Sequence, residues 1–271
     1  MSLEGKVVLI TGAGLPNGIG AGIARCFAAE RARVVITDLE GARIDDTVAS
    51  IEGHVTGMVA DASSQDAMRE TGDRILDQHG RIDVLVNNAG IGGPLLEVDE
   101  GDVRELSTET LSDEAWDAQL AANLRTTFAS SSAVSPKLED GGSIVNVASI
   151  AALGPSTTLP AYGAAKAGVV HLTKTLAMQL ASRRIRVNCI CPGILWTRAW
   201  EMLTANMQAT NPALADIPQR QIFEDVIARS TPLGEEQTPE DIGHLAVFYA
   251  STRARMITGA VVAVDGGISL A

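Results

Sequence analysis

The chain has 271 residues, of which 46% are hydrophobic and 3% aromatic, and its formal net charge is −12. Phosphate backbones are bound by concentrated basic faces, so this charge argues against nucleic acid as a partner. No apolar run approaches the ~18 residues that span a bilayer, and residues 1–6 lack the charged head and apolar stretch of a signal peptide. We therefore expect a cytoplasmic protein that binds neither nucleic acid nor membrane.

The three cysteines are too few for a disulfide scaffold. Cys189 and Cys191 form a Cys-x-Cys pair in an apparent strand, but no His or Cys cluster nearby would complete a ligand set. We expect reduced thiols and no metal site.

Short runs of Val, Ile and Leu alternate with longer segments of helical period, which indicates βαβ units and a parallel sheet. The runs are nearly continuously apolar, as expected of strands that are covered on both faces. The expected strands are Lys6–Thr11, Arg33–Asp38, His54–Ala60, Ile82–Asn87, Gly142–Ala148, Ile185–Ile190 and Val261–Val264. The expected helices include Ile19–Glu30, Ser64–His79, Ser112–Val134, Ala161–Ala181 and Pro239–Ala250.

No repeat or low-complexity linker interrupts this rhythm, so we predict a single domain over residues 1–271. Two segments depart from the pattern: Gly92–Thr110 is acidic and lacks a clear period, and Trp196–Glu236 is rich in Met, Gln, Asn and Pro. Long irregular segments are commonly functional, and parallel sheets bind ligands beyond the strand ends that both segments follow. We expect the substrate pocket there, with residues 196–236 inserted as a lid that excludes water.

A glycine-rich turn, Thr11–Gly20, lies between the first expected strand and a helix. Such a turn lets a pyrophosphate approach the amides of a helix N-terminus, although a plain strand-to-helix turn is the alternative. The second strand ends at Asp38, where a carboxylate accepts hydrogen bonds from the adenosine ribose and repels a 2′-phosphate. The loop has no Arg or Lys, and Arg43 is more simply a solvated helix residue, so NAD is favoured over NADP. Asp61 either contacts the adenine amino group or caps its own loop.

Tyr162 and Lys166 are four residues apart at the start of a helix, which places them on one face. A free tyrosine titrates near ~10, and an ammonium at ~4 Å attracts a phenolate by about 4 kcal/mol at an effective dielectric of ~20. We therefore expect a lowered Tyr162 pKa and a general acid/base role in alcohol oxidation or ketone reduction. Ser149, at a strand end, would orient the substrate oxygen unless it is only a cap. Asn123 is unusual inside a helix, because Asn competes for backbone hydrogen bonds.

Together these parts resemble the short-chain dehydrogenase/reductase family, in its common single-domain branch, over essentially the whole chain. The resemblance implies a Rossmann-type, doubly wound α/β fold with a mostly parallel seven-stranded sheet, and hydride transfer between a substrate carbon and nicotinamide C4. The matching residues are Thr11, Gly12, Asp38, Asp61, Asn87-Asn88-Ala89-Gly90, Asn123, Ser149, Tyr162, Lys166, Pro192-Gly193 and Thr197.

The resemblance makes Tyr162 the acid/base and Ser149 the group that stabilises the substrate oxygen. It implies that Lys166 lowers the Tyr162 pKa and binds the nicotinamide ribose, and that Asn123 holds a water on the proton path. It also implies a homotetramer built through the helices at Ser112–Val134 and Ala161–Ala181. The implied cofactor contacts are Gly12, Asn17, Gly18, Ile19, Asp38, Asp61, Ala62, Asn88, Ala89, Gly90, Tyr162, Lys166, Pro192, Gly193, Ile194 and Thr197.

The phosphate loop departs from the family pattern, because five residues separate Gly12 from Gly18 where the family has three. Leu15-Pro16-Asn17 therefore looks like a two-residue expansion. The spacing resembles that of enoyl-carrier-protein reductases, but those place Tyr and Lys further apart, and the residue seven after Tyr162 is Val169.

We predict an NAD-dependent oxidoreductase, a short-chain alcohol dehydrogenase or ketone reductase, that interconverts a secondary alcohol and a ketone. The alternative enzyme is an NADPH-dependent 3-oxoacyl-thioester or carbonyl reductase, and the non-enzymatic alternative is a catalytically silent cofactor-sensing or assembly protein. Arg198 would contact an anionic substrate group unless it is a surface arginine, which is the simpler interpretation. Apolar residues near the expected pocket instead favour alicyclic or aromatic character: Leu95, Leu96, Ala151, Leu153, Leu159, Ile194, Leu195 and Trp196.

Overall fold

Seven parallel strands form one sheet in the order β3-β2-β1-β4-β5-β6-β7, which confirms the predicted fold class. The structure is a computed structural model, and it describes residues 3–91 and 107–270. Each expected apolar run overlaps one strand, and β6 extends two residues beyond its expected end. The strands are β1 (Val7–Thr11), β2 (Arg33–Asp38), β3 (Val55–Val59), β4 (Val84–Asn87), β5 (Ser143–Val147), β6 (Arg186–Pro192) and β7 (Val261–Val264).

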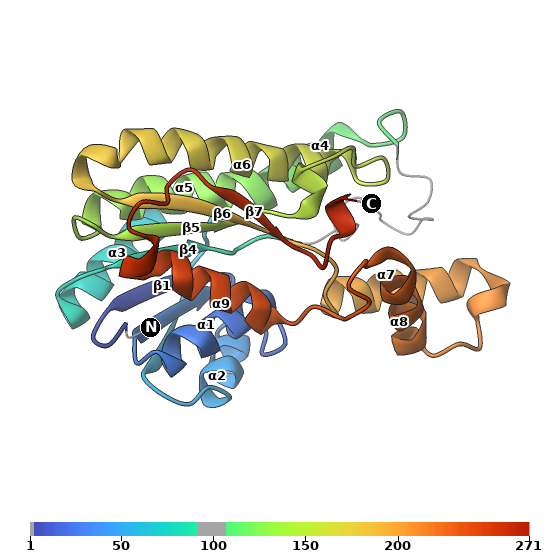
Figure 1. Cartoon of the computed structure of the whole chain (residues 1–271), viewed down its shortest axis with the longest axis horizontal. Coiled ribbons are helices and arrows are strands. Elements are labelled where there is room, and N and C mark those ends of the chain that lie inside the picture. Colours follow the sequence, from blue (N-terminus) through green and yellow to red (C-terminus); the bar gives the residue numbers. More distant parts are fainter. Residues whose placement is uncertain (1–2, 92–106, 271) are drawn as a thin grey trace.

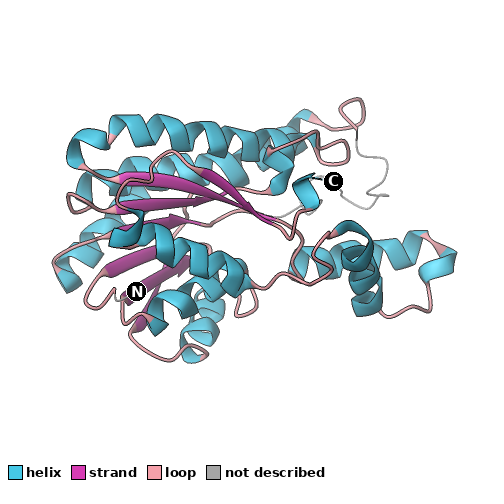
Figure 2. Ribbon diagram, in the orientation of Figure 1, coloured by secondary structure: helices cyan, strands magenta, loops and turns pink. Residues whose placement is uncertain are grey.

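Helices cover both faces of the sheet, as Figures 1 and 2 show. One face carries α1 (Ile19–Ala29), α2 (Gly41–Ala49) and α9 (Pro239–Ala250). The other carries α3 (Gln65–His79), α5 (Thr126–Val134) and α6 (Pro160–Gln179). Of these, α2 is not among the helices expected from the sequence.

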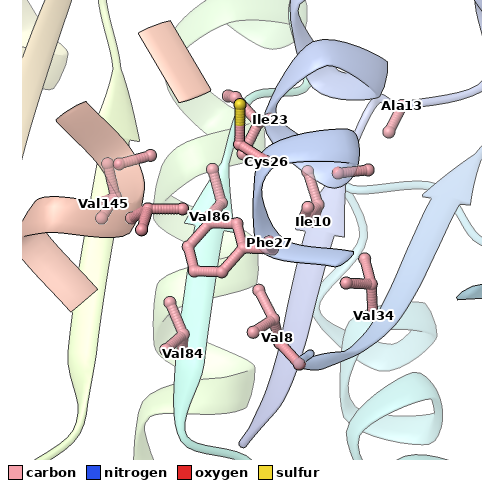
Figure 3. Close-up of a cluster of buried hydrophobic side chains, with 14 of the residues drawn as sticks. Val8, Ile10, Ala13, Ile23, Cys26, Phe27, Val34, Val84, Val86 and Val145 are labelled. Atoms are coloured by element: carbon pink, nitrogen blue, oxygen red, sulfur yellow. The ribbon is translucent and has the colours of Figure 1, made fainter. Parts of the chain in front are cut away.

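Strand residues alternate between two hydrophobic cores, because successive side chains of a strand point to opposite faces. Val8 and Ile10 pack with α1 and α9, whereas Val7 and Leu9 pack on the other face. Figure 3 shows Phe27 of α1, which is fully buried, against the valines of the central strands.

Helix ends follow local sequence signals. Ser64 accepts the backbone N–H of Ala67 at the start of α3, and Gly80 ends that helix with φ of +74°. Thr238 and Asp241 form a capping box at the start of α9, with Pro239 in its first turn. The predicted start of this last helix is confirmed.

The expected helix Ser112–Val134 is wrong as a single element. The chain forms α4 (Asp113–Leu120), then a π-helical turn at Ala121–Arg125, and then α5. A π turn accommodates one extra residue in a helix, and such turns are frequent at functional sites.

The expectation of an irregular segment at Trp196–Glu236 is also wrong, because it contains α7 (Arg198–Thr210) and α8 (Gln219–Ser230). The Trp196 and Trp200 rings pack edge-on against Phe223, with ring centres 5.0 and 5.3 Å away. The Arg220 guanidinium lies 5.3 Å from the Trp196 and Phe223 ring centres. Both helices thus bury apolar side chains against one another, beyond the end of the sheet (Figure 2). Most of Gly92–Thr110 lies outside the described residues.

Candidate active site

A cleft of about 840 Å³ lies where the strand order reverses, between β1 and β4. Ligands of open parallel sheets bind at such a switch point. Most of the predicted site residues line this cleft: Gly12, Gly18, Ile19, Asp38, Asp61, Ala62, Asn88, Ala89, Gly90, Asn123, Tyr162, Lys166 and Thr197. The others, which the cleft wall does not include, are Asn17, Ser149, Pro192, Gly193 and Ile194.

The ends of β1 and β4 are tied together at the base of the cleft. Asn88 Nδ2 donates to the carbonyls of Thr11 and Gly12 at 3.1 and 2.7 Å. Thr11 Oγ1 accepts the backbone N–H groups of Asn88 and Ala89. Gly12 has φ of +67°, and a Cβ there would lie 2.5 Å from the Ala89 Cα. Only glycine therefore permits this approach.

The expanded phosphate loop is held by hydrogen bonds. The Gly18 N–H donates to the Leu15 carbonyl at 2.9 Å, and Arg25 Nη1 donates to the Pro16 carbonyl at 2.9 Å. Arg25 also binds Glu240 of α9 at 2.6 Å. Asn17 is exposed at the tip. No side chain of the described residues caps α1 at Gly18, so its first amides remain available to an anion.

Acidic side chains line the part of the cleft where the sequence predicts adenosine binding. Asp38 accepts the N–H groups of Gly14 and Leu39, both at 2.8 Å. Arg43 lies in the cleft wall but pairs with Glu40 at 2.9 Å. Asp61 accepts the N–H and hydroxyl of Ser63, which are the bonds of a loop cap. Its place in the cleft wall leaves the adenine contact open as well.

Asn123 is fully buried in the π turn. Its Nδ2 donates to the carbonyl of Ile91 and to Gln119, and its Oδ1 has no hydrogen-bond partner among the described residues. A Cβ on Gly90 would lie 2.7 Å from this oxygen. The π turn therefore brings a buried, unused acceptor to the cleft.

Tyr162, in the first turn of α6, forms a hydrogen bond with the Ser149 side chain, which follows β5. Ser149 Oγ also accepts the Ala151 N–H at 3.2 Å, so its own proton is available to donate. Burial raises the Tyr162 pKa above its ordinary value, although the bond to Ser149 acts in the opposite direction. The expected lowering of the Tyr162 pKa by Lys166 is not found: burial and the neighbouring Cys191 raise this pKa, and the group that lowers it is the Ser149 side chain.

Lys166 is buried and lies with its Nζ 5.7 Å from the centre of the Tyr162 ring. It donates to the Val147 carbonyl at 3.3 Å. Burial lowers the Lys166 pKa to about 8. The Lys166 ammonium can therefore lose its proton at a pH close to neutral.

Two buried thiols lie behind Lys166 on β6. The Cys189 thiol donates to the Ile190 carbonyl at 3.8 Å, and its pKa is raised by the neighbouring Cys191 and by burial. Among the residues that the structure describes, no three His, Cys, Asp or Glu side chains gather as a metal site.

The segment after β6 is anchored outside the cleft wall. The Gly193 N–H donates to the Val264 carbonyl and to Gln237 Oε1, both at 3.0 Å. Farther along, Thr197, Arg198, Ala199 and Met202 line the cleft from the start of α7. Ala199 and Met202 were not predicted, since the sequence pattern does not show that a helix turns this face inward.

Several predicted substrate contacts lie elsewhere. Leu195 is buried in the core, and Trp196 packs on Phe223. Leu153 is 44% exposed outside the cleft wall. Leu95 and Leu96 lie outside the described residues.

Comparisons with known proteins agree with this geometry. A family model described as enoyl-(acyl carrier protein) reductase matches residues 12–269. The 3-oxoacyl-[acyl-carrier-protein] reductase FabG of Thermotoga maritima is 36% identical, with 99% of each chain covered. Human dehydrogenase/reductase SDR family member 4 is 34% identical, with 98% of this chain and 88% of that protein covered.

The chain belongs to the short-chain dehydrogenase/reductase family. The crystal structure of levodione reductase is similar over 99% of each chain, with a TM-score of 0.84 and 29% identity. The chain is therefore an oxidoreductase, and short-chain dehydrogenase/reductases use nicotinamide cofactors.

The residues that line the cleft fit a nicotinamide dinucleotide. They offer unshielded amides at α1 for a pyrophosphate and acceptors at Asp38 for ribose hydroxyls. A Cβ on Gly90 would lie 3.1 Å from Lys166 Nζ. The predicted catalytic residues Asn123, Tyr162 and Lys166 line the same cleft as Asp38. In addition, no helix within the described residues has both the length and the apolar character to cross a bilayer.

Proposed function

We propose that this short-chain dehydrogenase/reductase is NAD-dependent and interconverts a secondary alcohol and a ketone. The observation that carries the proposal is the meeting of Tyr162, Ser149 and Lys166 at one end of a cleft whose other end carries Asp38. The bound nicotinamide would supply the carbon that gives or accepts the hydride.

In ketone reduction, Tyr162 gives its hydroxyl proton to the substrate oxygen as the hydride reaches the carbonyl carbon. In alcohol oxidation, the phenolate takes that proton back. Ser149 donates to the substrate oxygen and holds it within reach of Tyr162. The raised pKa of Tyr162 keeps its hydroxyl protonated at neutral pH, which is the form that reduction needs.

Lys166 acts from behind the tyrosine. Its ammonium would stabilise the phenolate and donate to the ribose hydroxyls, and the partnerless Asn123 Oδ1 would hold a water on the route to solvent. The remaining predicted contacts would hold the cofactor, with backbone groups of Pro192, Gly193 and Ile194 toward its carboxamide.

The cofactor preference follows from charge. Asp38 and Glu40 place two carboxylates at the ribose end, and Arg43 is paired with Glu40, so a 2′-phosphate would meet repulsion.

The test is a screen of alcohols and ketones that follows NADH absorbance, with Tyr162→Phe as the inactive variant. The chain has two tyrosines, so Tyr249→Phe, in the core of α9, is a matched control that should retain turnover. If Tyr162→Phe kept near-normal turnover, the proposed chemistry would be wrong.

The second candidate is an NADPH-dependent 3-oxoacyl-thioester or carbonyl reductase. It is favoured by the 36% identity to the 3-oxoacyl-[acyl-carrier-protein] reductase FabG. Comparing kcat/KM with NADH and NADPH on one ketone separates the two, because a clear NADPH preference would replace our proposal.

We also propose that residues 196–236 form a lid over the substrate, as part of a single domain spanning residues 1–271. Thr197 and Met202 line the cleft while the aromatic cluster of Trp196, Trp200 and Phe223 stiffens the segment. Amide hydrogen exchange should slow in this segment when NADH and substrate bind, and no change would exclude a lid.

Met202, together with the apolar floor at Val147 and Ala148, favours an alicyclic or aromatic substrate of moderate size. The likeness to levodione reductase supports the same choice. Arg198 also lines the cleft, so a screen in which small anionic hydroxy acids give the highest kcat/KM would replace this proposal.

For the assembly we propose a homotetramer through α4, α5 and α6. Phe128 of α5 is 49% exposed beside a hollow of about 1210 Å³. Light scattering should give four chains, and fewer for Phe128→Glu.

The buried, unpaired thiols support our proposal of a reducing, cytoplasmic location.

A further inference from the structure

Gln119 is a buried glutamine of α4 that the proposed mechanism leaves without a role. It is 0% exposed, as is Asn123. Its Oε1 accepts a hydrogen bond from Asn123 Nδ2 at 2.8 Å. This is the shortest of three contacts from that nitrogen, since the carbonyls of Ile91 and Gln119 accept at 3.1 and 3.3 Å.

The contact depends on the π turn. In an α-helix, the carbonyl of residue 119 would bond the backbone N–H of residue 123, whereas a π turn moves that partner one residue along. The side-chain amide of Asn123 can then lie beside Gln119 and bond both its carbonyl and its Oε1.

The amide orientation follows from this arrangement. Three acceptors gather around Nδ2, so Oδ1 must point the other way. There it is buried without a partner among the described residues. A Cβ on Gly90 would lie 2.7 Å from this Oδ1 and 3.1 Å from Lys166 Nζ, so the amide oxygen and the ammonium face the same small space.

We propose that Gln119 is a positioning residue that holds the Asn123 amide with Oδ1 toward the Lys166 ammonium. This rests on the proposed function, in which a charged Lys166 is needed. Gln119 touches neither substrate nor cofactor in this role and acts through Asn123.

The groups around Lys166 explain why Asn123 Oδ1 matters for the charge of the lysine. The titratable groups that face the ammonium are the thiols of Cys189 and Cys191 on β6 and, on its own helix, Tyr162. From β5 it meets the Val147 carbonyl at 3.3 Å. No carboxylate of the described residues contributes to its pKa, which burial lowers to about 8. An oriented amide oxygen therefore favours the charged form.

The test follows two pH profiles in the full-length protein: kcat/KM for ketone reduction, and NADH affinity by fluorescence. Gln119→Met keeps the length but removes the acceptor, and it should move the alkaline midpoint of both profiles down. The energy of one weak hydrogen bond corresponds to about half to one pH unit. Gln119→Asn shortens the reach and should act in the same direction, whereas Gln119→Glu retains an acceptor and should not move the midpoint down.

Ser131→Ala is the matched control. Ser131 Oγ accepts from the buried Nδ2 of Asn87 at 2.8 Å, so its loss also removes one acceptor from a buried amide. This variant should melt at a lower temperature while both midpoints stay in place.

Unchanged midpoints in folded Gln119→Met and Gln119→Asn would overturn the proposal, and so would equal shifts in Ser131→Ala. A downward shift in Gln119→Glu would do the same. If the wild-type protein reduced no ketone, the proposed function would fail, while the NADH affinity profile would still test Gln119.

Discussion

Asp38, in the wall of the cleft, is in direct contact with Gly14 of the phosphate loop. The Gly14 N–H donates to Asp38 Oδ2 at 2.8 Å, and a Cβ on Gly14 would lie 2.8 Å from the same carboxylate. The absence of a side chain at residue 14 therefore lets the acid at the end of β2 sit against the phosphate loop. The backbone of the loop therefore fixes the position of the carboxylate that we propose selects NAD over NADP.

This relationship predicts the effect of Asp38→Asn. A hydrogen bond to a charged group contributes about 1.5–3 kcal/mol, so the ratio of kcat/KM for NAD over NADP should fall roughly 10- to 100-fold. Steady-state kinetics with both cofactors provides the measurement. Asp45→Asn, at an exposed position of α2, should leave the ratio unchanged. An unchanged ratio in Asp38→Asn would show that another residue selects the cofactor.

Lys166→Met should stabilise the protein while it impairs catalysis. The folded protein releases the Lys166 proton near pH 8, and the unfolded chain releases it near 10.5. Between these values the unfolded state binds more protons, so the free energy of unfolding rises with pH, and below pH 8 the buried ammonium costs about 1–3 kcal/mol.

Urea denaturation at about pH 7 should therefore show Lys166→Met to be more stable by that amount, and the difference should shrink toward about pH 10. Turnover should fall by about 10²-fold or more. Lys174, an exposed lysine later in α6, provides the control: Lys174→Met should change neither property. A less stable Lys166→Met variant would contradict the assigned cost of burial.

Arg25→Met should weaken cofactor binding without changing the chemistry. Arg25 holds the Pro16 carbonyl of the expanded phosphate loop, and one such bond contributes about 1 kcal/mol. The Kd for NADH, measured by fluorescence, should rise roughly 5-fold, whereas kcat at saturating cofactor should stay the same. Arg69→Met removes an exposed ion pair with Asp66 on α3 and should leave the Kd unchanged. Equal Kd values for the two variants would mean that Arg25 does not support the loop.

Gly22→Ala should destabilise the fold. A Cβ at Gly22 would lie 2.3 Å from Pro239 Cβ and 2.7 Å from the Pro239 carbonyl carbon. Such overpacking between α1 and α9 should cost about 1–3 kcal/mol, despite the better helix propensity of alanine. Thermal unfolding measures this, with Gly154→Ala as the control, because a Cβ there meets no atom within 4 Å. A stabilised Gly22→Ala variant would show that the two helices separate easily.

The sheet could be predicted from sequence because its strands are buried on both faces. A run such as Val7, Val8, Leu9 and Ile10 of β1 is therefore apolar, and its position before a glycine-rich turn also indicates where the cofactor would bind. Tyr162 and Lys166 could likewise be predicted to share a helix face, because their spacing of four residues does not depend on where the helix begins or ends.

The helices α7 and α8 could not be predicted in this way. Their apolar residues, among them Trp200 and Phe223, pack on each other and not on the sheet, so the usual period of a sheet-covering helix is missing. The π turn left only one sign in the sequence, the odd placement of Asn123 inside a helix. Gln119 gave none, because a glutamine in a helix is ordinarily a surface residue.

One chain of contacts joins the two halves of the cleft. Gln237, which directly follows the proposed lid, accepts from Gly193 and donates to the Val264 carbonyl. Two residues later, Pro239 lies against Gly22, and Glu240 binds Arg25, which holds the phosphate loop. A dinucleotide that stiffens this loop should also stiffen the chain around Gln237, so we expect compulsory addition of cofactor before substrate. If the bound dinucleotide raises the affinity for substrate, linkage requires that bound substrate raises the affinity for the dinucleotide by the same factor.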